Sequence, residues 1–249
     1  MESSIYNKIE LEFKNYKFIV ADLVIVADGG NSKIRPYITS IKSQYTGYFL
    51  VEGSVEKFKH KIPKIHNLMQ GCKMAVLGSE KLIVINLKGD GSALFYAGHK
   101  SAENWHLESG IDFSNKLSVL EWFKSDFTDW HPMFSELFNN ANTRFVPRPQ
   151  YAMPFDQEWP SKENLTLIGD AAHVMPPYGA AGVNMAMMDA LELSDSLNKY
   201  ATIQEAIQEY ETSIRKRNSP EIQRTLKFAG AFHSKDAVGF LKKFKQIMF

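Results

Sequence analysis

Two short apolar runs, each closed by glycine and an acidic residue, constrain the fold of this chain more than any other feature. The first covers residues 21–27 and ends in Asp28-Gly29-Gly30, and the second covers residues 164–168 and ends in Gly169-Asp170. Runs this short, rich in β-branched residues and stopped by glycine, are typical of strands buried on both faces of a helix-covered parallel sheet. The sequence therefore predicts one α/β domain whose two strands lie far apart in the chain.

The residues between these runs have a different pattern. Short segments of alternating polar and apolar residues cover 48–55, 73–77, 81–87 and 92–98. Lys88-Gly89-Asp90-Gly91 joins the last two and predicts a hairpin turn, because glycine readily adopts the positive φ angles that such turns need. This region is expected to be an antiparallel sheet with one open face. Upstream, an alternating segment at 8–13 predicts a hairpin-like pair within residues 5–26.

Helical patterns occupy much of the remaining chain. Apolar residues recur at helical spacing over 115–127 and 132–139, and helix is expected from Val183 to the C-terminus. Thr202-Ile203-Gln204-Glu205 is a capping-box pattern and predicts a helix start. Ser219-Pro220 predicts another, with serine as the N-cap and proline at the first helical position.

Two smaller groups on these helices have simple structural interpretations. Arg215-Lys216-Arg217 is expected near a helix end, where basic side chains complement the helix dipole. Met185, Met187 and Met188 are expected in the core. For the whole chain, we expect a parallel-sheet domain in two pieces with an inserted sheet domain and a terminal helix; the expected limits are 1–40, 41–150, 151–218 and 219–249.

Composition limits the kind of partner and compartment. The net charge of +1 offers no electrostatic reason to expect nucleic acid or an anionic membrane as a partner, and no apolar run has the length of a membrane span. The one cysteine, Cys72, cannot form an internal disulfide and is expected to be a small buried side chain. The histidines lack metal-ligand spacing, so no metal site is expected. We expect a cytoplasmic protein.

The most informative motif covers residues 169–184. It places a carboxylate, Asp170, at a strand end, followed by a loop of small residues, two prolines and a helix that begins near Val183. The carboxylate can accept hydrogen bonds from hydroxyl groups, and the helix N-terminus favours negative charge. These features suit a ligand with a polyol chain and a ring that becomes anionic, such as a flavin. The alternative is a strand–loop–helix connection without a ligand.

This motif resembles the second FAD-contacting motif of the para-hydroxybenzoate-hydroxylase-like flavin monooxygenases. The resemblance implies that Asp170, after Gly169, binds the ribityl chain of FAD. It further implies that the loop and helix start face the pyrimidine edge of the flavin, through Pro177, Gly182, Val183 and Asn184.

A second motif supports the same resemblance. Residues 28–35 are similar to the family's Asp-Gly-x-x-Ser-x-x-Arg motif, which implies that Asp28, Gly29 and Arg35 support FAD and take part in handling the nicotinamide donor. The sequence of residues 167–177 most resembles the tetracycline-inactivating branch of the family. This resemblance implies antibiotic inactivation as a candidate role.

The resemblance implies an α/β fold: an incomplete Rossmann-like FAD-binding domain with an inserted antiparallel-sheet substrate domain and C-terminal helices, the last of which bridges the two domains. It implies an NAD(P)H-dependent monooxygenase that hydroxylates an aromatic or polycyclic small molecule through a flavin C4a-hydroperoxide. Because the cofactor performs this chemistry, no catalytic side chain is assigned.

The substrate is expected over the open face of the antiparallel sheet. An approximate alignment places Asn67, Lys88 and His99 opposite the polar residues that hold the substrate in the tetracycline-inactivating relatives. Along the strand, Ala93, Phe95, Ala97 and His99 share one face. The residue types do not match those of the relatives, which implies a changed substrate, with tetracycline as one candidate.

Two departures from the family pattern leave alternatives open. The sequence contains no Gly-x-Gly-x-x-Gly, the fingerprint that receives the FAD pyrophosphate. We therefore expect an N-terminally truncated chain that by itself holds FAD weakly or not at all. Alternatives are a non-catalytic ligand-binding or interaction remnant, or one chain of a two-chain enzyme completed by a separate N-terminal polypeptide. In addition, Ala180 stands where the family has a loop glycine, and its Cβ could crowd the flavin or disfavour a positive φ.

Overall fold

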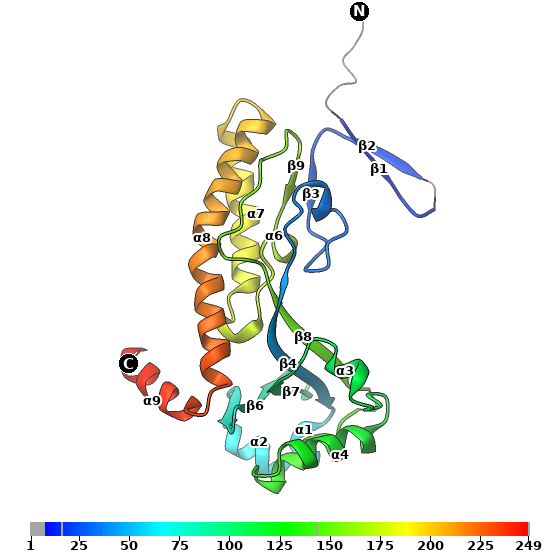
Figure 1. Ribbon diagram of the computed structural model, residues 1–249, viewed down its shortest axis with the longest axis vertical. Helices are drawn as coiled ribbons and strands as arrows, with labels where there is room; N and C mark the ends of the chain where they lie inside the picture. The colour runs from blue at the N-terminus through cyan, green and yellow to red at the C-terminus, as the bar shows by residue number, and fades with distance from the viewer. Residues whose placement is uncertain (1–7, 16, 143, 249) are drawn as a thin grey trace, which may run out of the picture. The chain divides into compact units, whose positions relative to one another are not determined.

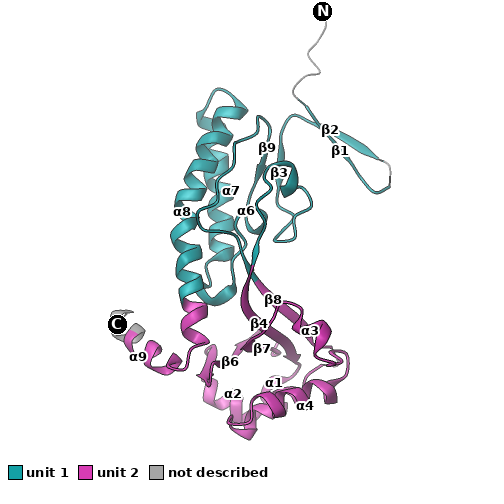
Figure 2. Ribbon diagram, viewed as in Figure 1, with its two compact units in different colours: residues 1–44, 151–227 teal, residues 45–150, 228–249 magenta. Residues whose placement is uncertain are grey.

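A computed structural model describes residues 8–15, 17–142 and 144–248, with side chains through residue 243. The chain divides into two compact units (Figure 2). Unit 1 consists of residues 1–44 and 151–227, and unit 2 of residues 45–150 and 228–249. The domain boundaries expected from the sequence followed residues 40, 150 and 218, whereas the boundaries between these units follow residues 44, 150 and 227.

Unit 1 contains two strand pairs (Figure 1). β1 (Ile9–Glu12) and β2 (Phe18–Ala21) form an antiparallel hairpin, while residues 5–7 of the expected pair lie outside the described residues. β3 (Val24–Val26) pairs in parallel with β9 (Leu165–Leu167), which confirms the expected parallel strands. The expectation that both strands are buried on both faces is wrong for β3. Ile25, between the buried Val24 and Val26, is 43% exposed, because no described element covers its side chain.

The helical part of unit 1 follows the two glycine-closed strand ends. It comprises η1 (Arg35–Tyr37), α6 (Asp170–His173), η3 (Pro177–Gly179), α7 (Gly182–Lys199) and residues 203–227 of α8 (Ile203–Phe232). Figure 1 shows α7 and α8 side by side. The core joins the strands to these helices through Val24, Val26, Leu165, Leu167, Leu193, Tyr210 and Ile214.

The start of α8 confirms the predicted capping box. The backbone N–H of Glu205 donates to Thr202 Oγ1 and the N–H of Thr202 donates to Glu205 Oε2, both at 3.2 Å. The second predicted start is wrong, because Pro220 lies inside α8. A proline there removes one helical hydrogen bond. The helix nevertheless continues, since Ile214 and Ile222 are both buried on either side of it.

Unit 2 contains a five-stranded sheet in the order β5-β6-β7-β4-β8. Its strands are β4 (Gln44–Val55), β5 (Met74–Gly78), β6 (Lys81–Leu87), β7 (Ala93–Lys100) and β8 (Val146–Ala152). The pairs β5–β6, β6–β7 and β4–β7 are antiparallel, as the alternating segments predict.

Short helices cover one face of this sheet. They are α1 (Phe58–Lys61), α2 (Pro63–Met69), α3 (Trp105–Glu108), α4 (Lys116–Asp126), η2 (Pro132–Phe134) and α5 (Ser135–Asn139). The Asn115 side chain caps α4 by accepting a hydrogen bond from Leu117 N. Apolar side chains from the sheet and these helices form the core of unit 2. After α8, α9 (Ala237–Met248) also belongs to unit 2 and contacts β5.

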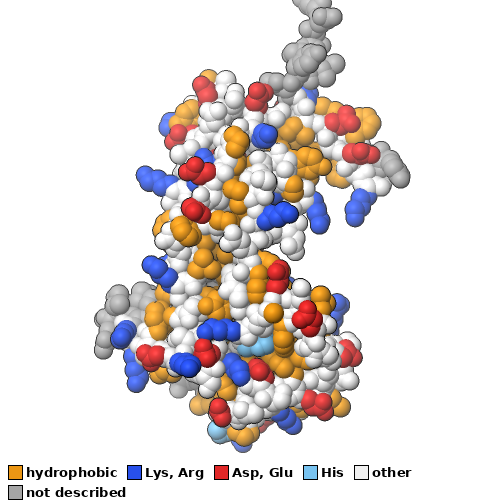
Figure 3. All heavy atoms as spheres, viewed as in Figure 1, with side chains coloured by type: hydrophobic (Ala, Val, Ile, Leu, Met, Phe, Trp, Pro, Cys, Tyr) orange, Lys and Arg blue, Asp and Glu red, His pale blue; other side chains and the backbone are white. Residues whose placement is uncertain are grey.

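Several surface features bear on the composition argument. Cys72 is exposed, so the expectation of a buried thiol is wrong. It lies in the turn after α2, between Gly71 and Lys73, where the chain reverses at the surface. On the face in Figure 3, basic and acidic side chains are interspersed. Among the described residues, no helix is both long and apolar enough to cross a membrane.

Candidate functional site

The two glycine-closed motifs meet at one edge of the parallel strand pair. Val26 pairs with Leu167, and Asp28 and Asp170 follow these strand ends closely. Because the strands are parallel, their carboxyl ends lie at the same edge, which is where ligands bind in open α/β sheets. The structure thus brings together two motifs that lie far apart in the sequence.

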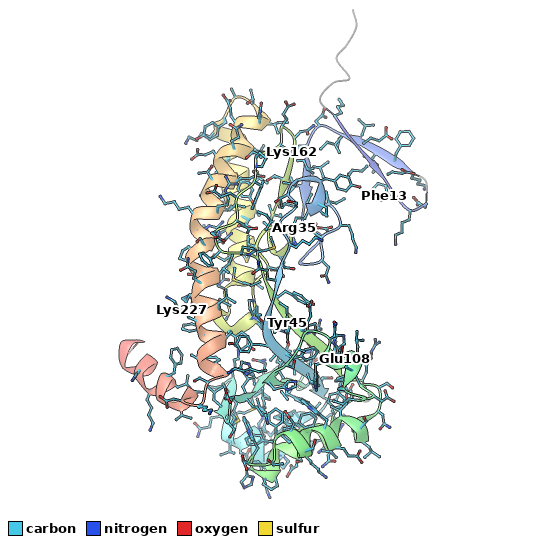
Figure 4. All side chains as sticks on the ribbon, in the orientation of Figure 1. Phe13, Arg35, Tyr45, Glu108, Lys162 and Lys227 are labelled. Carbon is cyan, nitrogen blue, oxygen red and sulfur yellow. The ribbon has the colours of Figure 1, made fainter. Side chains whose placement is uncertain are left out.

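Arg35, which is labelled in Figure 4, ties the two motifs to each other by hydrogen bonds. Its guanidinium donates to the carbonyl oxygens of Ala171 at 2.6 Å, Asp170 at 3.0 Å and Gly30 at 3.2 Å. Burial lowers the pKa of Arg35, while the charges of Asp28 and Asp170 raise it. Its side chain is 7% exposed. The cofactor role expected of Arg35 stays a prediction, and in this structure its guanidinium binds the backbone that carries Asp170.

The turn between β9 and α6 depends on glycine and on a buried carboxylate. Gly169 has φ +60° and ψ −143°, a conformation that side chains disfavour. Its N–H donates to Asp189 Oδ2 on α7 at 2.6 Å, and His173 Nε2 contacts the same oxygen at 2.6 Å. Asp189 therefore holds both ends of the Gly169–His173 segment against α7.

Arg217 on α8 completes this network. It donates to Asp189 Oδ1 at 2.7 Å and to Glu192 Oε1 at 2.9 Å. Burial would raise the pKa of Asp189, but hydrogen bonds from His173, Arg217 and Gly169 outweigh it and hold the pKa below its ordinary value. The assignment of Arg217 to a helix end is wrong, because α8 continues to Phe232.

In contrast to these occupied groups, the Asp170 carboxylate is available to a ligand. The side chain is exposed, and no hydrogen bond or ion pair of the described residues uses its oxygens. One oxygen lies 3.9 Å from the position of a Cβ on Gly182, the first residue of α7. Pro177, Val183 and Asn184 are exposed in the same unit. Asp28 is also exposed, but its carboxylate accepts a hydrogen bond from Lys33 N at 2.8 Å and so stabilises its own loop.

The loop before α7 shows why the glycine is displaced by one position. A Cβ on Gly179 would overlap the buried Thr225 side chain of α8, so that site requires glycine. Ala180 takes the left-handed conformation, with φ +52° and ψ +28°. The positive φ that alanine disfavours is thus present, at a cost of about 1 kcal/mol.

Ala180→Gly is expected to raise the free energy of unfolding by about 0.5–1 kcal/mol, because relief of the left-handed strain exceeds the extra entropy of glycine in the unfolded chain. Ala181→Gly is the matched control, since Ala181 has ordinary right-handed φ and ψ and should lose stability. Urea denaturation of both variants measures the difference. A lower free energy of unfolding in Ala180→Gly would contradict the proposed backbone strain at Ala180.

The three residues expected to contact substrate do not gather on the open sheet face. Asn67 is exposed on α2, and Lys88 is exposed in the turn between β6 and β7. His99 is 6% exposed and packs against Trp105, with ring centroids 4.3 Å apart, and Trp122. The stripe of Ala93, Phe95, Ala97 and His99 is the face that the helices cover. Strand alternation correctly placed these residues on one face but could not tell which face is covered.

The opposite sheet face carries a polar cluster that sequence reasoning missed. Arg148 on β8 donates to both carboxylate oxygens of Glu52 on β4, at 2.9 and 3.3 Å. Burial raises the pKa of Tyr96 on β7, and the Glu52 charge raises it further. Tyr96 pairs with Glu52 across the strands. The sequence pattern that could have identified this cluster is the alternation of side chains along each strand. Glu52 on β4 and Tyr96 on β7 alternate with the apolar residues of the core.

Comparisons with known proteins agree with this geometry. Residues 156–225 match the family model described as an FAD binding domain. Monooxygenase penA of Penicillium thymicola is 24% identical over 215 residues, covering 72% of this chain and 50% of that protein. The 6-hydroxynicotinate 3-monooxygenase of Pseudomonas fluorescens is 26% identical over 199 residues, covering 78% of this chain and 48% of that protein. The chain thus spans about half the length of these curated relatives.

Solved structures share the fold. HpxO of Klebsiella pneumoniae, complexed with FAD and uric acid, has a TM-score of 0.78 at 20% identity, covering 98% of this chain and 60% of that one. Tetracycline destructase Tet(51) has a TM-score of 0.67 at 18% identity, and the match covers 98% of this chain and 64% of that one. Residues 156–225 thus match an FAD binding domain, and the chain is similar in sequence and in fold to FAD-dependent monooxygenases.

Proposed function

We propose that this chain supplies the flavin-proximal half of an FAD site in an NAD(P)H-dependent aromatic monooxygenase. The observation that carries the proposal is the exposed Asp170 carboxylate, which has no hydrogen-bond or ion-pair partner among the described residues and lies beside the start of α7. Arg35 and Asp189 hold the backbone on both sides of it. A rigid backbone around an available carboxylate suits a site that binds hydroxyl groups.

The residues of this chain would bind and orient the cofactor. Asp170 would accept hydrogen bonds from the ribityl hydroxyls of FAD, and the first N–H groups of α7 would stabilise negative charge at the pyrimidine edge. Pro177, Gly182, Val183 and Asn184 would line that edge. When bound, FAD supplies electron transfer from the nicotinamide donor and activation of oxygen.

Asp170→Ala is expected to weaken flavin binding about tenfold to a hundredfold, because each charge-assisted hydrogen bond contributes roughly 1.5–3 kcal/mol. The effect should exceed that of His173→Ala, since the His173 ring faces Asp189. Titration of flavin fluorescence against each variant measures it. Asp156→Ala, which removes an exposed carboxylate upstream, is the control. Equal affinities for Asp170→Ala and the control would contradict the assignment.

We also propose that a further polypeptide segment covers part of unit 1. Along α7, Val183, Met187 and Leu191 recur at helical spacing and are 75%, 68% and 54% exposed. The expectation that the methionines lie in the core is wrong for Met187 and for Met188, which is 38% exposed. β3 has β9 as its partner, and Ile25 is exposed. A strand and helix carrying the Gly-x-Gly-x-x-Gly fingerprint would suit these surfaces and would add the pyrophosphate site.

Addition of such a segment should slow hydrogen exchange along α7 and β3 and should tighten binding of FAD more than binding of riboflavin. Riboflavin lacks the pyrophosphate and adenosine, so it reports on the residues of this chain alone. If the chain alone already bound FAD much more tightly than riboflavin, the proposed division of the site would be wrong. If neither flavin bound under any condition, a non-catalytic role would be favoured.

For the substrate, we propose a phenolic or polycyclic aromatic small molecule on the open sheet face. The polar cluster of Glu52, Tyr96 and Arg148 offers donors and acceptors there, and the exposed Arg148 guanidinium retains N–H groups for a ligand. The relative named as a 6-hydroxynicotinate 3-monooxygenase supports an aromatic substrate. The tetracycline-inactivating branch remains a candidate within the same family.

With FAD and the completing segment present, donor oxidation coupled to oxygen uptake is expected with phenolic substrates. Arg148→Ala should reduce kcat/KM at least about tenfold, because a site built for hydrogen bonding loses a partner. Arg144→Ala, outside the cluster, serves as the control. Fast, coupled turnover of tetracycline alone in the panel would contradict the phenolic assignment.

We further propose a cytoplasmic location. An exposed free thiol such as Cys72 is better tolerated where thiols are kept reduced.

A further inference from the structure

A small cavity in unit 1 lies behind the motif that carries Asp170. It is lined by Gln157 and Trp159 from the segment before β9, His173 from α6, and Arg215 and Asn218 from α8. Ile214 and Ile222 close it with apolar surface. The cavity offers about 10 Å³ to the centre of a water molecule. This is on the order of the space that one water needs.

Five buried polar atoms of the lining residues have no hydrogen-bond partner in the described part of the chain. They are Gln157 Oε1, Trp159 Nε1, His173 Nδ1, Arg215 Nη1 and Asn218 Nδ2. Their residues are mostly buried; His173 is 1% and Asn218 3% exposed. Folded proteins rarely leave such atoms unpaired, because each loses its hydration on burial. Their concentration around one cavity points to a ligand that several of them share.

The other atoms of these side chains decide which are donors and which are acceptors. Gln157 Nε2 donates to Ala172 O at 2.9 Å, so Oε1 remains as an acceptor. Asn218 Oδ1 accepts from Arg217 at 3.1 Å, so Nδ2 remains as a donor. His173 Nε2 donates to the Asp189 carboxylate, which can only accept, and in the tautomer with its proton on Nε2 the Nδ1 atom is an acceptor.

The charge of the arginine on the cavity lining already has partners. Arg215 is the cation on the lining, and its Nη1 lies 3.8 Å from Glu211 Oε2. Its guanidinium also lies over the Trp159 ring, 5.0 Å from the centroid. The positive charge is therefore already shared with a carboxylate and an aromatic face. A small ligand that both donates and accepts hydrogen bonds fits the atoms left without partners.

We propose that this cavity is a binding site for a buried water molecule, which links the segment before β9, α6 and α8. The water accepts from Trp159 and Asn218 and donates to Gln157 and His173 Nδ1. It thereby holds the His173 ring with its Nε2 proton toward Asp189. Because Asp189 also binds Gly169 N, Trp159 and Asn218 are positioning residues for the turn that presents Asp170. The inference is independent of flavin binding.

Nuclear magnetic resonance on the uniformly ¹⁵N-labelled chain tests the site without any cofactor. The Trp159 indole N–H should show cross-relaxation with water of the sign expected for a molecule resident longer than about a nanosecond. Absence of this signal from a buried, slowly exchanging Trp159 N–H would overturn the proposal. A saturable shift of the same resonance with chloride or phosphate would assign the cavity to an ion and would also overturn it.

Trp159→Phe tests the link between the water and the turn, since it removes the donor and retains the ring. The His173 Nδ1 resonance should shift, and exchange of the Gly169 amide should accelerate about fivefold. Trp130→Phe, the same change in unit 2, should alter neither. Normal His173 and Gly169 signals in folded Trp159→Phe would overturn the positioning role, and failure of that variant to fold would leave the wild-type water signal as the deciding measurement.

Discussion

Asp189→Ala is expected to lower the free energy of unfolding of unit 1 by about 3–4 kcal/mol. The carboxylate is fully buried and accepts hydrogen bonds from Gly169 N and Arg217, and it contacts His173 Nε2 at 2.6 Å. Removing one member of a buried charged network leaves the others unpaired, and such changes typically cost about 3–5 kcal/mol. The loss of unfolding free energy should lie at the lower end of this range, because Arg217 keeps Glu192 as a partner.

Two variants on the same helix make this test specific. Asp189→Asn retains the shape and one acceptor but loses the charge, so its effect should be intermediate. Asp195→Ala removes an exposed carboxylate from α7 and should change stability by less than about 0.5 kcal/mol. Urea denaturation, read by hydrogen exchange of α6 amides, compares the three. A loss in Asp189→Ala no larger than in Asp195→Ala would refute the role of the network.

Unit 2 is expected to lose stability as the pH falls from about 6.5 to about 4, because two buried histidines resist protonation. Burial lowers the pKa of His99 to about 4, with Asp126 opposing this and Lys81 adding to it. Burial likewise lowers the pKa of His233 to about 4, although its hydrogen bond to the Glu80 carbonyl opposes the shift. In the unfolded chain both rings have their ordinary pKa of about 6.5.

The sign follows from proton uptake. Between the two pKa values the unfolded state binds a proton that the folded state does not, so acid favours unfolding. The stabilisation is complete above about pH 6.5. From pH 7 to pH 5 we expect a loss of about 2 kcal/mol per histidine, at about 1.4 kcal/mol per pH unit.

Urea denaturation at pH 7 and pH 5 measures this loss. His99→Phe keeps an aromatic ring against Trp105 and Trp122 and should reduce the pH dependence by about half. His60→Asn, at an exposed position on α1, is the control and should leave it unchanged. Equal stability of the wild-type chain at both pH values would contradict the buried, neutral histidines.

Local patterns predicted the elements whose stability is local. The Thr202 capping box begins α8, and the Lys88–Gly91 turn joins β6 to β7 as expected. The β3–β9 pair was predictable as well from its short, glycine-closed apolar runs, although Ile25 on β3 is exposed. Signals of this kind depend on backbone conformation and side-chain periodicity, which neighbouring residues determine.

Predictions failed where long-range packing outweighed a local preference. Pro220 was expected to start a helix, but buried Ile214 and Ile222 on both sides keep α8 continuous through it. His99 was expected on an open sheet face, but α3 and α4 cover that face. The alternation of side chains along a strand shows which residues share a face, but it cannot identify the face that helices cover. Ala180 adopts the disfavoured positive φ, while the glycine stands at position 179, where the Thr225 side chain leaves no room for a Cβ.

The sequence by itself determined the family resemblance, the order of the strand and helix segments and the placement of Asp28 and Asp170 at the ends of apolar strands. Tertiary structure alone decided what those side chains do. It turned Arg35 toward backbone carbonyls, left the Asp170 carboxylate exposed and placed Asp189 and Arg217, from two separate helices, beneath the Gly169 turn. The physical reason is that a buried charge is stable only where distant segments bring it partners, and that meeting depends on packing of the whole unit.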